Sequence, residues 1–390
     1  MTDLSHQFDV AIAGAGPAGT SAAIQLALNG ARVLLVEQKK FPRPKLCGEF
    51  ISPECIAHFE RLGVAGAMLG AGASLISNTV FYTRSGASVH LPSEWFKPGI
   101  RALGLSRSEM DHKLLERAGE VGVTVLEDAH ASGLLHDGGC VAGLTVRVDD
   151  KLHACKARIT IDATGRSRSL ARRPDQRLIK PKLVAFKVHL KNTRLNEGDC
   201  EIYFYQRGYG GLSRIENDSS NLCFIVSARD VRRFGSNPET VMREVVMENK
   251  RASSALRDAR RSGPWLSVSL TGFERHSVTP QPGLLTIGDA AAFIDPFTGS
   301  GMLMALESGA LAAETITRHS PCVVTIATEY RAAYAKTFHS RMRVAALLRR
   351  AAFIPGLAGA AIRLTGLSAR LRREIARATH QSAAPSADAG

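Results

Sequence analysis

The feature that most constrains this chain is a glycine pattern close to its N-terminus, in the stretch VAIAGAGPAGTSAA. Gly14, Gly16 and Gly19 follow an apolar run at residues 8–13 and open an alanine-rich run at residues 17–29. In such a pattern the first glycine permits a tight turn, the second lets backbone approach a pyrophosphate, and the third allows close packing of helix on strand. The pattern therefore predicts a strand, a phosphate-binding turn and a helix.

Glu37 ends a second apolar run, at residues 32–37, and follows Gly19 by 18 residues. A carboxylate at the end of the second strand of such a unit can accept hydrogen bonds from an adenosine ribose. The glycines alone are weak evidence, because a chance glycine-rich turn would show the same letters. With Glu37 they predict a β-α-β unit that binds a dinucleotide, with the phosphates at the helix N-terminus.

A second glycine-rich stretch, LLTIGDAAAFIDPFTGSGMLMALESGALAAE at residues 284–314, indicates which dinucleotide is bound. It resembles the second flavin motif of FAD oxidoreductases, in which the aspartate, here Asp289, holds the flavin ribitol. The resemblance implies that the helix start near Gly301 and Met302 points amide groups at the pyrimidine edge of the ring. A reduced flavin is negative there, and a helix N-terminus favours an anion by about 0.3–1 kcal/mol. The alternative is an ordinary glycine-capped helix.

The stretch RITIDATGRSRSLARR, at residues 158–173, supplies a third motif. Its Ala-Thr-Gly, which ends at Gly165, resembles the end of the flavoprotein nucleotide domain. Aromatic hydroxylases of the p-hydroxybenzoate type usually have Asp-Gly there, and Thr164 stands in place of the aspartate. Arg107, at the start of a predicted amphipathic helix, resembles the family's arginine that reaches the cofactor, although a surface arginine would look the same.

Cys47 lies in the stretch FPRPKLCGEFISPEC, directly after the predicted dinucleotide unit. A metal site lacks partners, since no nearby His or Cys completes a ligand set. A Cys47–Cys55 disulfide is conceivable but disfavoured in a reducing compartment, and an inert buried thiol stays open. The segment resembles the Cys-Gly-Glu segment of geranylgeranyl reductases, in which the cysteine and glycine lie beside the isoalloxazine ring. We interpret Cys47 as a catalytic-site residue at the flavin face, with direct proton transfer left open.

The resemblance to the geranylgeranyl reductase family of FAD-dependent oxidoreductases covers most of residues 8–320 and implies a p-hydroxybenzoate hydroxylase-like flavoprotein fold. No metal ligand is assigned. The residues assigned to the cofactor are Gly14, Gly16, Ala18, Gly19, Glu37, Cys47, Gly48, Arg107, Ala129, Gly165, Asp289, Pro296, Gly299, Gly301 and Met302.

The substrate site is predicted from the stretch IYFYQRGYGG. In the reductase family a Tyr-x-Trp-x-Phe-Pro pattern lines the lipid cavity, which assigns Tyr203 and Tyr205 to substrate binding. Arg207 and Gly208 replace the Phe-Pro, so Arg207 faces either an acidic or phenolate substrate or solvent at a hairpin end. Flavin halogenases share the cofactor fold, but their Trp-x-Trp-x-Ile-Pro motif is missing from this chain.

Composition bounds the partners and the compartment. Seven scattered cysteines without a C-x-x-C pair predict free thiols in a reducing cytoplasm. We expect neither a secretory signal nor a membrane span. Of the net charge of +14, nine arginines against Glu374 alone fall in residues 341–378, which indicates a solvated face or a peripheral contact with an anionic inner membrane surface. Without a zinc spacing or RNA-binding signature, no nucleic acid partner is expected.

These features predict an α/β fold, a Rossmann-like FAD-binding domain with a β-rich substrate domain and a helical C-terminal segment. The FAD-binding domain is expected to be discontinuous, over residues 1–75, 101–175 and 272–330. The substrate domain then comprises residues 76–100 and 176–271. Residues 331–378 form the helical segment, and 379–390 a disordered tail.

The expected activity is that of an FAD-dependent oxidoreductase acting on a hydrophobic small molecule, such as an isoprenoid, a quinone or a polyketide-like compound. Reduction of a C=C bond is the first prediction, with NAD(P)H or another reductant as electron donor. Hydroxylation of an aromatic or polyketide substrate by an FAD-dependent monooxygenase is the alternative. A non-catalytic flavin-binding protein is a minor third. In each case the flavin would provide the redox chemistry and the protein the placement and electrostatics.

Overall fold

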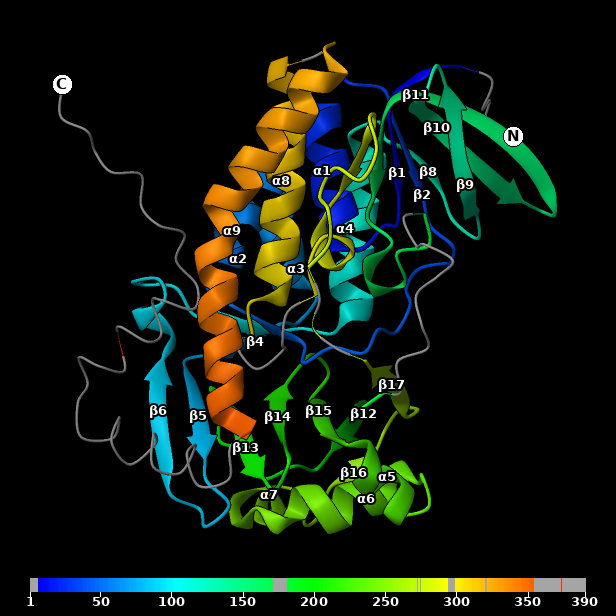
Figure 1. The fold of residues 1–390 in the computed structure, drawn as a ribbon. Helices are drawn as coiled ribbons and strands as arrows, with labels where there is room; N and C mark the ends of the chain where they lie inside the picture. The colour runs from blue at the N-terminus through cyan, green and yellow to red at the C-terminus, as the bar shows by residue number, and fades with distance from the viewer. Residues whose placement is uncertain are drawn as a thin grey trace.

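Two large sheets organise the chain (Figure 1). A computed structural model describes residues 6–170, 181–271, 273, 275–293, 299–319, 321–353 and 373, with the backbone alone at 348–353. One sheet carries the N-terminal unit and the other lies below it in Figure 1. The predicted α/β class with a β-rich second part is confirmed.

The upper sheet begins with the predicted β-α-β unit: β1 (Phe8–Ala13), α1 (Pro17–Leu28) and β2 (Val33–Val36). β1 runs parallel to β2 on one side and to β11 (Lys151–Asp162) on the other. The outer parallel strands are β8 (Thr124–Leu126) and β18 (Leu284–Thr286). β1 and β2 are almost fully buried, as near-continuous apolar runs in a parallel sheet require.

The long strand β11 belongs to two pairings. Its first half pairs antiparallel with β10 (Cys140–Val148), which pairs in turn with β9 (His130–Asp137). Its second half joins the parallel sheet between β1 and β18. The carboxyl ends of β1 and β11 therefore meet at one edge, where a ligand is expected to bind in an open α/β sheet.

Helices cover the upper sheet. α1 packs against α8 (Gly301–His319), which in turn contacts α9 (Val323–Phe353), and the three stand side by side in Figure 1. The approach of α1 to α8 is close: a Cβ at Gly309 would lie 2.3 Å from the carbonyl oxygen of Ala18. α4 (Arg107–Glu120) also contacts α1, and it starts with the expected cap, because Ser106 Oγ accepts the Glu109 N–H.

A small sheet of β3 (Phe50–Ile51), β7 (Ala102–Gly104) and β4 (Ser74–Ile76) follows the Cys47 segment. It is continuous with α2 (Cys55–Leu62) and α3 (Ala65–Gly70). A Cβ at Gly104 would lie 1.9 Å from the carbonyl oxygen of Arg214, so this small sheet presses directly on the lower part of the molecule.

The lower sheet is mostly antiparallel and has the order β16-β12-β15-β14-β13-β5-β6, with β17 also paired to β12. The expected hairpin at residues 76–92 is present as its outer two strands. The strands are β5 (Asn78–Tyr82), β6 (Ser88–Pro92), β12 (Leu183–Lys191), β13 (Asp199–Tyr205), β14 (Gly208–Arg214), β15 (Ser220–Ser227), β16 (Arg260–Arg261) and β17 (Leu266–Leu270).

The two faces of the lower sheet bury different side chains. One face packs against the helices α5 (Ala228–Arg233), α6 (Pro238–Val245) and α7 (Lys250–Ala255), which lie at the bottom of Figure 1. The other face carries a separate cluster that we call the apolar wall, made of Val89, Ala185, Phe204, Tyr209, Ile225 and Leu270.

Two further expectations concern membrane spans and disulfides. Within the described ranges, no helix is long and apolar enough to cross a membrane. All seven cysteines are free, so Cys47 and Cys55 form no disulfide. Most of the predicted basic membrane-contact segment, and the whole tail at 379–390, lie outside the described residues.

Candidate active site

The glycine turn between β1 and α1 has the expected division of roles. Gly14 has a φ of +103°, and a Cβ there would lie 2.4 Å from the carbonyl oxygen of Ala163 at the end of β11. A Cβ at Gly19 would lie 1.9 Å from the carbonyl oxygen of Gly14. Around Gly16 a Cβ would meet nothing within 4 Å among the described atoms. Two glycines thus serve packing, and Gly16 leaves open space at the helix start, as a phosphate needs.

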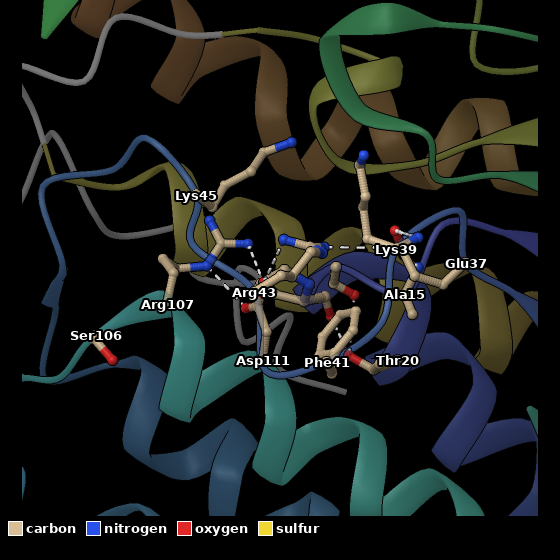
Figure 2. Close-up of polar contacts among 12 residues, drawn as sticks. Ala15, Thr20, Glu37, Lys39, Phe41, Arg43, Lys45, Ser106, Arg107 and Asp111 are labelled. Atoms are coloured by element: carbon tan, nitrogen blue, oxygen red, sulfur yellow. Dashed lines mark hydrogen bonds and ion pairs between the residues drawn. The ribbon is translucent and has the colours of Figure 1, made fainter. Parts of the chain in front are cut away.

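Glu37 lies beside this turn, and the backbone of Ala129 lies next to Glu37. Glu37 Oε2 accepts the Ala15 N–H at 2.9 Å, and its Oε1 accepts the Lys39 N–H at 3.1 Å (Figure 2). The Ala129 N–H donates to the backbone oxygen of Glu37 at 2.9 Å. The carboxylate is buried and held in place next to the first residues of the turn.

Arg43 was not predicted from the sequence, yet it occupies the centre of the polar cluster in Figure 2. Its guanidinium lies 3.6 Å from Glu37 and 3.4 Å from Asp111, and it stacks 4.5 Å from the centre of the Phe41 ring. Its buried Nε and Nη1 atoms have no hydrogen-bond partner among the described residues. A buried arginine with unused donors is suited to a phosphate oxygen.

Arg107 lies near the opposite side of the same cluster. Its Nε and Nη2 donate to the two carboxylate oxygens of Asp111 at 2.8 and 2.7 Å. Burial lowers the pKa of Arg107, but Asp111 and then the Cys47 thiol outweigh burial and raise it. The predicted cofactor arginine is therefore a fixed positive charge that lies near Cys47.

Asp289 lies after β18 in the short turn Gly288–Ala290. Burial raises the pKa of its carboxyl, and the positive charges of Lys45, Arg107 and Arg166 act in the opposite direction. Removal from water lowers the pKa of the Lys45 ammonium. The positive charges of Arg107 and Arg43 lower it further. Several cations thus converge near one buried carboxyl, which fits a ligand with a diphosphate and a ribitol hydroxyl chain.

The second flavin motif continues as expected where it is described. Gly299 has a φ of +66° and packs against the Phe50 ring, and α8 begins at Gly301. A Cβ at Gly301, Gly48 or Gly165 would meet nothing within 4 Å among described atoms. Pro296 lies outside the described residues. These open backbone positions, with the free space at Gly16 and the cations, fit FAD.

Replacing Asp289 with alanine should lower the affinity for FAD about 10- to 100-fold, because a buried charge-assisted hydrogen bond contributes about 1.5–3 kcal/mol. The measurement is the flavin-to-protein ratio after purification, followed by titration of the apoprotein with FAD. Asp230→Ala is the matched control, since Asp230 is buried but pairs with Arg207 in the lower part of the molecule. Equal FAD affinity in both variants would remove Asp289 from the site.

The Cys47 segment is tied to the lower sheet. The Cys47 carbonyl accepts the Asn221 side-chain N–H at 3.0 Å, and its Sγ accepts the Glu49 N–H at 3.4 Å. Glu49 is fully buried and contacts Lys187, His189 at 2.7 Å and the Arg107 N–H at 2.8 Å.

Sequence reasoning used Glu49 only as part of a motif. Burial raises its pKa, but the His189 hydrogen bond and the Lys187 charge lower it further than burial raises it. One signal could have found the pair: Lys187 and His189 interrupt the apolar run LVAFKVHLK two residues apart, and so share a strand face.

The structure does not bring the three predicted substrate residues to this region. Tyr203 and Tyr205 lie in the cluster that packs against α5–α7. The Tyr203 hydroxyl donates to Glu201 at 2.7 Å, and the Tyr205 hydroxyl donates to the Ile225 carbonyl at 3.0 Å. Arg207 lies in the turn between β13 and β14 and pairs with Asp230 at 2.9 Å. Their role in substrate binding stays a prediction, and the geometry favours the apolar wall instead.

Comparison with known proteins identifies the family and relatives of the chain. The FAD binding domain family matches residues 7–316. The chain is 27% identical over 362 residues to a menaquinone reductase of Mycolicibacterium smegmatis, covering 88% of this chain and 85% of the relative. It is 26% identical over 322 residues to a digeranylgeranylglycerophospholipid reductase of Methanosarcina mazei, covering 80% and 75%.

A solved structure extends the comparison to the fold. The flavin-dependent brominase Bmp2 superposes with a TM-score of 0.82 at 23% identity, over 96% of this chain and 94% of the brominase. Because both reductases and a brominase share this architecture, the fold does not select the reaction. The family match covers most of the chain and agrees with the glycine turn and the Asp289 region: this protein belongs to the FAD binding domain family and is an FAD-dependent oxidoreductase.

Proposed function

We propose that this protein reduces a C=C bond of a hydrophobic small molecule, with Cys47 beside the flavin. Two relatives are named as reductases of lipid-like molecules, a quinone and a glycerophospholipid. The proposal includes NAD(P)H or another reductant as the source of electrons. It also includes peripheral membrane contact, which would give access to a water-insoluble substrate.

The observation that carries the proposal is the position of the Cys47 segment between two apolar clusters. Cys47 packs against the core of the upper part, while the neighbouring Leu46 packs against the apolar wall. Phe81, Phe273 and Phe293 border the same wall. A substrate on this wall would meet mainly carbon atoms, which suits an isoprenoid or quinone tail.

Reduction of a C=C bond requires a hydride equivalent at one carbon and a proton at the other. Bound reduced flavin supplies the first, and an acid supplies the second. The Cys47 thiol is partly exposed and can give a proton to a substrate on the wall. The Glu49 N–H lies 3.4 Å from Cys47 Sγ, and the Arg107 guanidinium lies near the same thiol.

The contacts of Arg207 bear on the competing hydroxylation. A hydroxylase acting on a phenolate would use a free cation in the substrate part, and Arg207 was the sequence candidate. In the structure Arg207 instead neutralises Asp230. Trp265 packs edge-on against Phe186 and Phe224 under the helices, away from the wall, so it lends no support to halogenation either.

An anaerobic reaction separates these activities. The flavin is reduced chemically without oxygen, a menaquinone or a geranylgeranyl lipid is added, and product mass is followed. A gain of two hydrogens under strict anaerobiosis is the expected result. A product that forms only in air and carries one extra oxygen would establish the monooxygenase. Bound flavin that turns over with no donor or acceptor would favour the non-catalytic alternative.

If reduction is observed, Cys47→Ala should lower kcat by about 100-fold, the low end of the effect of a general acid. Flavin content should stay normal, since Cys47 donates no hydrogen bond to the phosphate region. Cys140→Ser is the control, because Cys140 is exposed on β10. Unchanged kcat in Cys47→Ala would make the thiol a packing residue rather than the acid.

A further inference from the structure

A buried charge network joins the Cys47 segment to the lower sheet, and its centre is Glu49. The Glu49 side chain is 0% exposed, that of Lys187 is 3% exposed, and that of His189 is 28% exposed. Lys187 Nζ also donates to the Lys45 carbonyl at 2.9 Å. Two side chains of one strand, β12, therefore hold two points of a segment that is about 140 residues away in sequence.

The backbone at Glu49 makes this arrangement unusual. Its φ is +54°, in the left-handed region that glycine adopts most easily. A strained residue persists only where its surroundings determine its conformation. Here the side chain contacts Lys187 and His189, while the backbone N–H reaches Cys47 Sγ and the backbone oxygen accepts the Leu105 N–H at 3.3 Å. The carboxylate is thus what compensates for the strained turn.

We propose that Glu49 is a positioning residue: through Lys187 and His189 it fixes the Cys47–Gly48 turn between the flavin region and the apolar wall. Asn221 of β15 completes the attachment by donating to the Cys47 carbonyl. The same carboxylate accepts the first N–H of α4 from Arg107, so the network also holds the start of the helix whose first guanidinium lies near Cys47. The inference rests on the proposed function for its effect on turnover, but the position of Cys47 can be measured without any substrate.

The test compares Glu49→Gln with Glu201→Gln in the flavin-loaded protein. Glu201 is a matched control, because it is equally buried, lies on β13 of the lower sheet and pairs with Arg251 at 2.6 Å, without contacting the Cys47 segment. Alkylation by iodoacetamide is followed at each cysteine by mass spectrometry, with the exposed Cys140 as internal reference. Glu49→Gln should raise the Cys47 rate relative to Cys140 at least about tenfold, because the segment opens locally more often. Glu201→Gln should leave that ratio unchanged.

Two further variants keep the test decisive. His189→Leu removes a contact at the exposed side of the network, so the protein should fold even if Glu49→Gln does not, and the Cys47 rate should again rise. Glu49→Asp keeps the negative charge, so its Cys47 alkylation rate should lie between those of the parent and of Glu49→Gln. Where a reducible substrate is known, Glu49→Gln should lower kcat with little change in KM.

The Cys47 alkylation rate and the melting temperature together decide between three outcomes. If Glu49→Gln and His189→Leu only lower the melting temperature, as Glu201→Gln does, and Cys47 keeps its parental alkylation rate, the positioning role is wrong. If Cys47 becomes reactive in both variants while the parent reduces no C=C bond, the positioning role holds and the proposed reaction fails. If the Cys47 alkylation rate rises in Glu49→Gln but not in His189→Leu, His189 has no part in the network, and the proposed link to β12 through that residue is overturned.

Discussion

Gly16→Val should weaken FAD binding by about 1000-fold or more while the apoprotein stays folded. The reason is local: Gly16 has an ordinary extended backbone, with φ −71° and ψ 178°, and a side chain there meets no described protein atom within 4 Å. The added methyl groups would occupy the space expected for the diphosphate instead. The measurement is fluorescence titration of the apoprotein with FAD, together with thermal unfolding of the same apoprotein.

Two glycine variants serve as controls for Gly16→Val. Gly66→Ala lies in the helix α3 with open space around it and should keep both flavin and stability. Gly19→Ala should destabilise the apoprotein itself, because its Cβ would collide with the Gly14 carbonyl. Normal FAD affinity in Gly16→Val would mean that the cofactor does not cross this turn, and would withdraw the assignment of the whole site.

The nucleotide-binding half could be predicted because its chemistry is local in sequence. Gly14, Gly16 and Gly19 are needed by one short turn, and Glu37 follows one helix later. Each requirement concerns backbone conformation or a close approach that only glycine permits. The parallel pairing of β1 with β2 then follows from the helix that connects them.

The substrate half was harder, because β13 is buried on both faces. Tyr203, Phe204 and Tyr205 are all buried, so neither face is marked by solvent exposure as the one that carries the apolar wall. The family pattern pointed to the tyrosines, whereas Phe204 is the one that lies on the apolar wall. A one-residue difference in a strand exchanges the two faces completely.

Glu49 shows a second limit of the sequence. A buried carboxylate must find partners, and the sequence shows candidates but not which ones meet. The pairing with Lys187 and His189 depends on how the lower sheet docks against the small sheet at Gly104, which is a long-range packing result. Local propensity carries no information about that docking.

Arg341→Met should destabilise the protein by about 3 kcal/mol at neutral pH, because it removes the buried arginine of a largely buried ion pair. Arg341 lies on α9 with 1% of its side chain exposed, and it contacts both carboxylate oxygens of Glu307 on α8. Burial raises the pKa of Glu307 and of Glu54, and the Arg341 charge opposes that rise in both. Without the arginine, two half-buried carboxylates would lose a nearby positive charge.

The stability lost in Arg341→Met should be smaller at low pH than at neutral pH. The two carboxyls have folded-state pKa values above their unfolded ones, and removing Arg341 raises the folded values further, so the folded variant takes up protons more readily than the unfolded chain. Its deficit should therefore shrink as pH falls from about 7.5 to about 5.5, which urea unfolding at both pH values can measure.

Arg318→Met is the control for this destabilisation, since Arg318 pairs with Glu314 on the same helix α8 but both side chains are more than half exposed, at 64% and 60%. It should cost at most about 1 kcal/mol, with little dependence on pH. Equal losses in the two variants would show that α9 is held to α8 by its apolar contacts alone. A deficit that grows toward low pH would contradict the pKa argument, because the two carboxyls would then have to have lower pKa values in the folded variant than in the folded parent.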